Sequence, residues 1–430
     1  MEKAKNKKLI PLVTTGVVVV GTMILGGCSF GGTTPVSENQ VSEIDGDVST
    51  VESNETTDDT ETVKQTDTTS TTVETTTTTV SVEEKRNKEI EEKLASMTTE
   101  EKVAQMFVVM PEAISDASPV TEGYELKEGL YEYPLGGILL MGQNIINKSQ
   151  TKELIKDVQM YSEDRIGIPL LMCVDEEGGP VKRVSGTIEG VPELKSAEEM
   201  FADGDDIYKV GKTVGGYLSE LGFNVDFAPV ADVVSESSAG VINGRSFSDQ
   251  PKEVAKAVKD FANGLESGNV YATFKHFPGH GPTRSDTHNG SAYVDKSMDE
   301  LESWDLVPFQ EAIDGGAKFI MISHHTVNVI DPDGTPATLS KAVITDLLKK
   351  KMGYEGIVVS DALNMGAISD YYGSDEAALM AVDAGADILL EPSDFYTAYD
   401  AVVNAVENGE IEEERIDESV RKILEVKAEL

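Results

Sequence analysis

The sequence is poor in cysteine, histidine, tryptophan and basic side chains. Its 430 residues include two cysteines, one tryptophan and five histidines, and 36 basic residues stand against 77 acidic ones, for a formal net charge of −41. Two cysteines build no disulfide framework, and we expect Cys173, which lies in an apolar run, to be a small buried hydrophobic residue. So acidic a chain lacks the basic face that nucleic-acid binding requires. We therefore expect no nucleic-acid partner.

The first 27 residues have the layout of a bacterial secretion signal. Lysines crowd residues 1–8, and an uncharged apolar run that ends in ILGGCS follows them. The run is about long enough to cross a bilayer, so an uncleaved membrane anchor is the alternative. ILGGC resembles a lipobox, which implies cleavage before Cys28 and acylation of its thiol, with palmitate among the acyl chains. Since several acyl chains hold a protein firmly to a bilayer, we expect an extracytoplasmic lipoprotein on the cell membrane.

A low-complexity segment follows, and it is predicted to be a disordered tether. Residues 31–80 contain no aromatic side chain, and threonine, serine and acidic residues dominate residues 28–85. Such a composition cannot bury enough apolar surface to offset the entropy cost of ordering. The predicted organisation is a signal peptide over 1–27, a linker over 28–85 and one catalytic domain over 86–430.

The rest of the chain alternates short apolar runs with stretches of helical periodicity. Near-continuous apolar strands between helices are typical of a parallel sheet covered on both faces. Eight of them predict a closed (β/α)₈ barrel, an α/β fold of the TIM type, and an open doubly wound sheet is the alternative. No G-x-G-x-x-G motif supports a dinucleotide fold. The predicted strands are 106–110, 136–141, 169–174, 225–230, 271–277, 318–323, 356–360 and 387–392.

Chemically capable side chains stand where the predicted strands end. Asp175 follows the third strand, Lys275 and His276 end the fifth, His324 follows the sixth and Asp361 follows the seventh. Any one of them could be a helix cap or part of a buried ion pair. Because the carboxyl ends of barrel strands form the active face, their shared position predicts an active site.

Asp361 and the segment Asp286-Thr287-His288 suggest covalent sugar chemistry. A carboxylate at the mouth of a barrel can attack an anomeric carbon, although Asp361 could instead be an N-cap. A retaining glycosidase needs a second group that protonates the leaving oxygen and later deprotonates water. No second carboxylate stands out. His288 can fill this role, because imidazole titrates near neutrality and Asp286 can orient it and stabilise its charged form.

Four motifs in this order resemble glycoside hydrolase family 3. They are DEEGGPVKR, NGRSF, KHFPGHG with its downstream D-T-H, and SDALNMGAI. The D-T-H points to the β-N-acetylhexosaminidase branch, and the likeness runs from about residue 97 to the last helical stretch. The resemblance implies that Asp361 is the nucleophile, that His288 is the acid/base and that Asp286 polarises it.

The resemblance also implies the residues that hold the sugar. Lys275 and His276 match the pair that grips hydroxyls, and Asp175, Arg183 and Arg245 match ligands of the terminal sugar. The two arginines could instead make structural ion pairs. Planar carboxylates and guanidinium groups suit sugar hydroxyls.

Three other groups near these motifs have lesser expected parts. We expect Glu177 to support its loop and His280 to anchor its glycine turn. No role is assigned to His324 or His325.

We therefore expect an exo-acting, retaining β-N-acetylglucosaminidase that releases terminal N-acetylglucosamine from cell-wall fragments. Many family members append a second domain that contributes to the site. Because this sequence ends at Leu430, we expect the acid/base to come from the barrel. We also expect a monomer without cofactor or metal.

Four alternatives stay open. They are a β-glucosidase, a phosphorylase, a sugar-binding lipoprotein without catalysis, and a metal hydrolase on the same fold. The last would need about three ligands for zinc, and no H-x-H or H-E-x-x-H motif supplies them.

Overall fold

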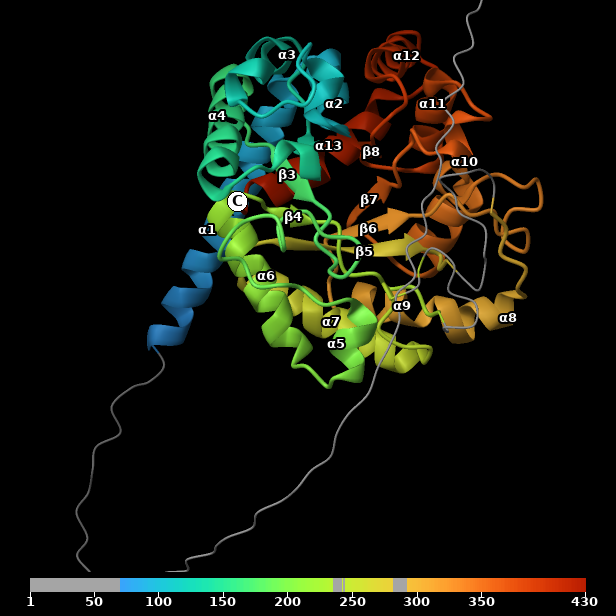
Figure 1. Cartoon of the computed structure of the whole chain (residues 1–430). Coiled ribbons are helices and arrows are strands. Elements are labelled where there is room, and N and C mark those ends of the chain that lie inside the picture. The colour runs from blue at the N-terminus through green and yellow to red at the C-terminus, as the bar shows by residue number, and fades with distance from the viewer. Residues whose placement is uncertain (1–69, 235–241, 243, 281–291) are drawn as a thin grey trace, which may run out of the picture. The chain divides into compact units, whose positions relative to one another are not determined.

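Eight short parallel strands form the centre of the structure (Figure 1). The computed structural model describes residues 70–234, 242, 244–280 and 292–430. Each strand falls within one of the eight predicted apolar runs, and every strand residue except Tyr271 is buried. The strands are β1 Phe107–Val109, β2 Gly137–Leu139, β3 Leu171–Val174, β4 Val225–Asp226, β5 Tyr271–Phe277, β6 Phe319–Ile322, β7 Ile357–Ser360 and β8 Leu389–Leu390.

The strands close into a barrel. Each pairs in parallel with its sequence neighbour from β1 to β7, and β8 pairs with β1 through Phe107 opposite Leu389. A parallel bridge between Val359 and Ile388 joins β7 to the residue before β8 and completes the ring. The predicted (β/α)₈ barrel is therefore confirmed, and the open sheet is excluded. The strands read as continuous apolar runs because both of their faces are covered.

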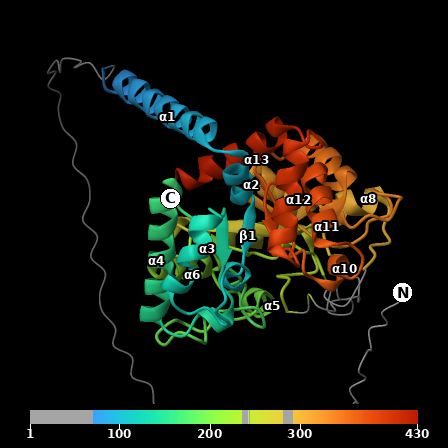
Figure 2. The same ribbon diagram turned by 90° about the horizontal axis from the view of Figure 1, so that it is seen from above.

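Helices surround the barrel and follow the strands in turn (Figure 2). Their ends match local signals: the Asn147 side chain accepts from the amides of Ser149 and Gln150 at the start of α4, and Gly167, at φ 68°, ends it. The longer helices are α2 Thr99–Gln105, α4 Lys148–Ile166, α6 Ile207–Leu221, α7 Pro251–Ser267, α9 Val307–Asp314, α11 Ser374–Ala384, α12 Phe395–Glu407 and α13 Glu413–Lys427. The shorter ones are α3 Lys127–Glu132, α5 Ala197–Ala202, α8 Met298–Glu300 and α10 Gly366–Ser369.

Single-turn and π-type segments complete the connections. The helical segment between β6 and β7 has hydrogen bonds of the wider π type. The 3₁₀ turns are η1 Pro111–Ile114, η2 Gly123–Leu126, η3 Gly142–Asn144 and η7 Ala337–Leu339, and the π segments are η6 Leu301–Asp305 and η8 Ala342–Lys351.

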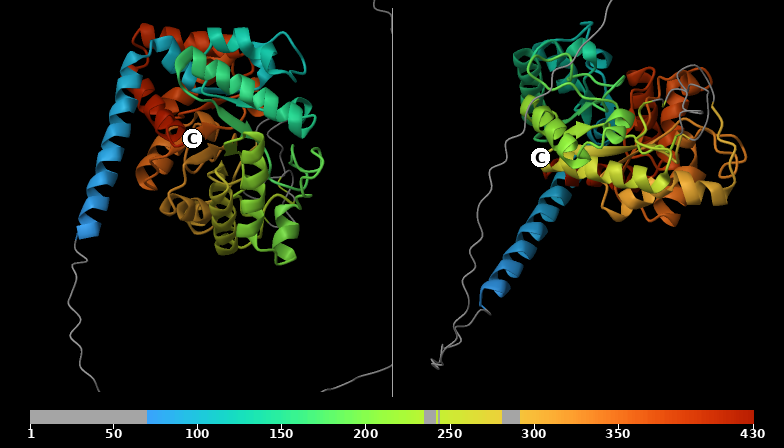
Figure 3. Two further views of the ribbon diagram at one scale, coloured as in Figure 1. Left: turned by 90° about the vertical axis from the view of Figure 1, so that its left-hand side faces the viewer. Right: turned by 60° about the horizontal axis from the view of Figure 1, so that its bottom comes forward.

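Helix α1 (Ser70–Ser96) precedes the barrel and begins ahead of the domain boundary predicted at residue 86. Its C-terminal part, in which Ile90 and Leu94 are buried, contacts α13, and Glu91 forms an ion pair of 2.6 Å with Arg421 of that helix. Figure 3 shows the rest of α1 extending beyond this contact. Among the described helices, none combines the length and the apolar character needed to cross a bilayer. Residues 1–69, with most of the predicted linker, lie outside the described residues, so the domain boundaries stay a prediction.

Candidate active site

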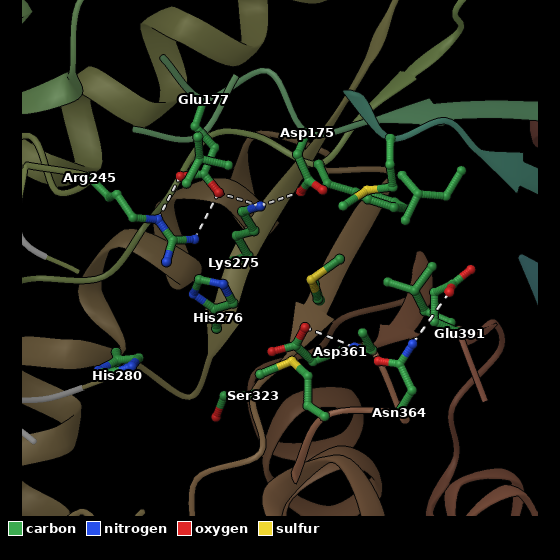
Figure 4. A pocket seen from close by; sticks show the side chains of 18 of the residues that line it. Asp175, Glu177, Arg245, Lys275, His276, His280, Ser323, Asp361, Asn364 and Glu391 are labelled. Carbon is green, nitrogen blue, oxygen red and sulfur yellow. Dashed lines mark hydrogen bonds and ion pairs between the residues drawn. The ribbon is translucent and has the colours of Figure 1, made fainter. Parts of the chain in front are cut away.

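A cavity of about 330 Å³ lies over the carboxyl ends of the strands (Figure 4). Side chains at or directly after the carboxyl ends of all eight strands line it. This is the face on which (β/α)₈ barrels build their active sites. Of the predicted site residues, those that line the cavity are Asp175, Arg183, Arg245, Lys275, His276 and Asp361.

Asp361 follows the last residue of β7 and is partly exposed to the cavity. Its main-chain nitrogen donates to the carbonyl oxygen of Ile322 in β6 at 3.0 Å, which fixes the residue at the barrel rim. The Ala362 amide donates to Oδ1 at 2.8 Å. This bond leaves Oδ2 as the oxygen available to a ligand.

The surroundings of Asp361 keep its carboxylate ionised. Burial opposes the ionisation of Asp361. His324, His276 and the Ala362 amide favour its charged form and hold the pKa of Asp361 below its usual value. An ionised carboxylate with one oxygen directed into a cavity can act as a nucleophile.

A chain of alternating charges forms the wall over β3 to β5. Lys275 Nζ lies 2.9 Å from Asp175 Oδ1 and 2.5 Å from Glu177 Oε1. Arg245 binds Glu177 with two hydrogen bonds, Nε to Oε2 at 2.7 Å and Nη2 to Oε1 at 2.8 Å. Arg183 Nη2 approaches Asp175 Oδ2 at 3.8 Å. Fixed donors and acceptors of both signs suit the hydroxyls of a sugar.

These ion pairs keep Glu177 and Lys275 charged. Although burial opposes it, Lys275 and Arg245 lower the pKa of Glu177 to about 2. Burial also opposes the charge of Lys275, yet Asp175 and Glu177 raise its pKa. Glu177 also lines the cavity and holds Lys275 and Arg245 in place, which is more than the loop support expected of it.

Glu176, not Glu177, supports the loop that carries Arg183. The Glu176 carboxylate is buried and accepts the amides of Arg183, Val184 and Ser185 at 2.7 to 2.8 Å. The Tyr217 hydroxyl donates to it at 2.8 Å. Because three consecutive amides converge on one side chain, the position of Arg183 is fixed by its backbone.

Asp232 organises the turn after β5. It is fully buried, its Oδ2 lies 2.7 Å from His276 Nδ1, and its Oδ1 accepts the His280 amide at 2.7 Å. Burial opposes the charge of Asp232, but His276 and His280 hold the pKa of this carboxyl below its usual value. An ionised carboxylate only accepts hydrogen bonds, so His276 donates from Nδ1 and presents Nε2 to the cavity.

His280 and His325 form a second wall over β5 and β6. Their rings lie 4.0 Å apart between centroids, and both side chains are buried. Burial lowers the pKa of His280 to about 4 and lowers the pKa of His325 as well, so both rings are neutral at neutral pH. The turn is therefore anchored by Asp232, which accepts the His280 amide, and not by the His280 side chain as expected. The His280 ring lines the cavity.

Several further residues of the site escape prediction from the sequence. Asp232 stands in the apolar run APVADVV, where a lone carboxylate must find partners, and this was the available signal for it. Glu391 lines the cavity at the end of β8 and follows an apolar strand as Asp175 and Asp361 do. His288, Asp286 and Cys28 lie outside the described residues, so their roles stay predictions.

Sequence comparison connects this geometry with known proteins. The profile described as "Glycosyl hydrolase family 3 N terminal domain" matches residues 98–426. Beta-hexosaminidase A of Pseudoalteromonas piscicida is 32% identical over 344 residues, which cover 74% of this chain and 58% of that protein. A beta-hexosaminidase of Tolumonas auensis is 33% identical over 267 residues, which cover 62% of this chain and 78% of that protein. The chain therefore spans less than two thirds of the first relative and more than two thirds of the second.

Solved structures give the same result. A family 3 beta-N-acetylglucosaminidase from Paenibacillus sp. str. FPU-7 matches with a TM-score of 0.71 and 34% identity, over 77% of this chain and 62% of that one. LpqI of M tuberculosis matches with a TM-score of 0.68 and 31% identity, over 77% of this chain and 94% of that one. The resemblance seen in the four sequence motifs is confirmed.

Proposed function

The chain belongs to glycosyl hydrolase family 3, and on that premise we propose that it is an exo-acting, retaining β-N-acetylglucosaminidase. Relatives named beta-hexosaminidase and a structure titled beta-N-acetylglucosaminidase support this specificity. The observation that carries the reaction is the ionised Asp361 carboxylate at the cavity floor, with one oxygen held by an amide and the other available.

In the first step, Asp361 Oδ2 attacks the anomeric carbon while the bond from that carbon to the leaving oxygen breaks. The leaving oxygen takes a proton from the His288 imidazolium, whose charge Asp286 stabilises. The products are a glycosyl-enzyme ester on Asp361, a neutral imidazole and a free aglycone. The Ala362 amide, by holding Oδ1, keeps the nucleophile oriented.

In the second step, neutral His288 removes a proton from water as the water oxygen attacks the anomeric carbon. The ester bond breaks, Asp361 recovers its charge and His288 becomes an imidazolium again. Two displacements at one carbon retain its configuration. The proton taken from water in this step is the one that the next leaving group receives.

The charged wall over β3 to β5 accounts for exo action. Lys275 is only 3% exposed and Glu177 only 6%. The sugar hydroxyls that they would bind therefore belong to a unit at the inner end of the cavity. A sugar held there by Asp175, Lys275 and Arg245 would have its non-reducing end at this buried wall, which supports exo action.

Cell-wall fragments are the proposed natural substrate, and Cys28 is the proposed lipid attachment point. The lipobox-like ILGGC supports placing the enzyme outside the cytoplasm, where such fragments arise. Metabolic labelling with a palmitate analogue tests the anchor. Wild-type protein should be labelled, whereas Cys28→Ala should not.

The reaction is tested by turnover of a 4-nitrophenyl N-acetyl-β-glucosaminide. Asp361→Ala should abolish turnover, and a 5-fluoro glycosyl fluoride should leave a covalent sugar on the peptide that contains Asp361, as located by mass spectrometry. His288→Ala should slow poorly activated substrates far more than activated ones. Assays with and without phosphate separate hydrolysis from phosphorolysis. Turnover by Asp361→Ala at the wild-type rate would refute the proposal.

A further inference from the structure

Glu391 is a carboxyl group in the cavity that the proposed reaction leaves without a task. It follows β8 directly, lines the same cavity as Asp361 and is 6% exposed. Figure 4 shows Glu391 and Asn364 on the other side of Asp361 from Lys275 and Arg245. The ring of strands agrees, because β8 lies between β1 and β7 and therefore across the barrel from β4, the middle strand of the charged wall.

The backbone of Glu391 adopts a conformation that costs free energy. Its φ is 47°, in the left-handed region that side chains other than glycine and asparagine rarely occupy. Main-chain bonds on both sides hold it there: its amide donates to the Val108 carbonyl at 3.0 Å, and the Asn364 amide donates to its carbonyl at 2.8 Å. Strain of this kind gathers at sites where the side chain has a function.

Unlike Asp175 and Glu177, which pair with Lys275, the Glu391 side chain has no cationic partner among the described residues. The Met110 amide donates to Oε1, and Asn364 Nδ2 lies 3.4 Å from Oε2, too far for a strong bond. Among the ion pairs of the described residues, none includes Glu391. Burial, with Glu112 nearby, raises the pKa of Glu391 to about 8, so the group is a neutral acid at neutral pH. With Oε1 accepting from Met110, Oε2 carries a hydrogen that can be donated to a ligand.

The surface around this donor is apolar. Met110, Leu390 and Met365 line the cavity beside Glu391 and Asn364. The charged wall over β3 to β5 is the kind of surface that binds hydroxyls, and the surface around Glu391 differs from it. One polar pair set among thioether and alkyl groups fits a substituent that combines a methyl with an amide, and an acetamido group next to the anomeric carbon has both.

We propose that Glu391 is a specificity-determining residue that donates a hydrogen bond to the carbonyl oxygen of the sugar's 2-acetamido group, with Met110, Leu390 and Met365 around its methyl. This assignment rests on the proposed function and deepens it. The specificity follows because a sugar that lacks the amide would leave the buried Glu391 donor unpaired.

Three variants separate recognition from folding. Glu391→Met fills the space without a donor, Glu391→Gln restores a donor of the same length, and Glu391→Asn tolerates the left-handed backbone but is one carbon shorter. The measurements are kcat/KM for the 4-nitrophenyl N-acetyl-β-glucosaminide, the inhibition constants of N-acetylglucosamine and of glucose, and the thermal unfolding midpoint.

Glu391→Met and Glu391→Asn should each weaken inhibition by N-acetylglucosamine by roughly tenfold or more and change inhibition by glucose by less than about twofold. Glu391→Gln should stay within about threefold of wild type for both sugars. Glu391→Asn should unfold at the wild-type temperature, so its loss of selectivity cannot be a folding defect.

Two results would overturn the assignment. One is an equal loss for both sugars, as a merely structural role would give, and the other is unchanged selectivity in Glu391→Asn. Failure of the proposed function itself would appear earlier and separately, because the wild-type enzyme would then not cleave the N-acetylglucosaminide, and the inference would fall with it.

Discussion

His324 Nε2 donates to the carbonyl oxygen of Ala362 at 2.8 Å and so connects the segment after β6 to the residue that follows Asp361. The same Ala362 donates its amide to Asp361 Oδ1. One dipeptide, Asp361-Ala362, is therefore held from both of its ends. His324 also favours the charged form of Asp361.

Replacing His324 should move the acidic limb of the pH profile. In His324→Leu, burial still opposes the charge of Asp361, but the largest opposing influence is gone, so the pKa of Asp361 should rise. The acidic limb of kcat/KM should shift to higher pH by about one unit, because the nucleophile must be ionised in the free enzyme. An acidic limb that stays at the wild-type pH would show that His324 does not set the charge of Asp361.

Asp232→Asn should impair both folding and catalysis. The change removes a buried charge and sets an amide against His276 Nδ1 and the His280 amide. Stability to urea should fall by about 3 kcal/mol, and kcat/KM should fall by roughly 10²-fold or more because His276 loses its fixed tautomer.

Asp387 provides the matched control for this experiment. It too is fully buried and lies at the opposite end of the barrel, before β8, where it accepts from Val358 N at 2.9 Å and Ser419 Oγ at 2.7 Å. Asp387→Asn should lower stability by a similar amount and leave kcat/KM within about twofold. If the two variants lose activity equally, Asp232 has no special connection with the site.

The fold could be predicted because its determinants are local. Each strand is a short apolar run, and eight of them between helical stretches leave few arrangements. The positions of Asp175, Lys275 and Asp361 followed for the same reason, since a parallel barrel brings all its strand ends to one face.

The partners of these residues could not be predicted, because they come from distant parts of the chain. Nothing in the composition of APVADVV identifies His276 as the group that Asp232 holds, 44 residues away. The left-handed backbone of Glu391 is imposed by Val108 and Asn364 through main-chain bonds and leaves no mark on a sequence that reads as strand followed by turn. Glu176 and Glu177 are adjacent in sequence, and only the turn of the loop decides which of them faces the cavity.

Glu177→Gln should weaken substrate binding. The neutral glutamine side chain would no longer balance the positive charges of the buried Lys275 and Arg245, so both side chains would reorient. KM should rise by roughly tenfold or more, with a smaller change in kcat if the wall serves mainly in binding. Steady-state kinetics on the N-acetylglucosaminide measures both constants.

The exposed ion pair between Lys195 and Asp203 provides the control for Glu177→Gln. Lys195 Nζ lies 2.9 Å from Asp203 Oδ2, with side chains 44% and 61% exposed. Asp203→Asn should change neither KM nor kcat by more than about 1.5-fold. If KM rises equally in Glu177→Gln and Asp203→Asn, the cause is a general effect of net charge and not a role for Glu177.

Lys427 should make the stability of the protein depend on pH, and it lies at the end of the barrel away from the cavity. It is buried, and its Nζ donates to Gln105 Oε1 at 2.7 Å. Burial lowers the pKa of Lys427 to about 7 from its usual 10.5. Between these values the unfolded chain binds a proton that the folded protein does not, so this group makes stability rise with pH from about 7 to 10.5 and contributes no slope below 7. The difference in unfolding free energy between wild type and Lys427→Met, measured in urea at pH 7, 8.5 and 10, should therefore shift in favour of wild type as pH rises, by on the order of 4 kcal/mol over the full range. The groups common to both proteins cancel in that difference, so a difference that does not vary with pH would mean that Lys427 keeps its ordinary pKa in the folded state.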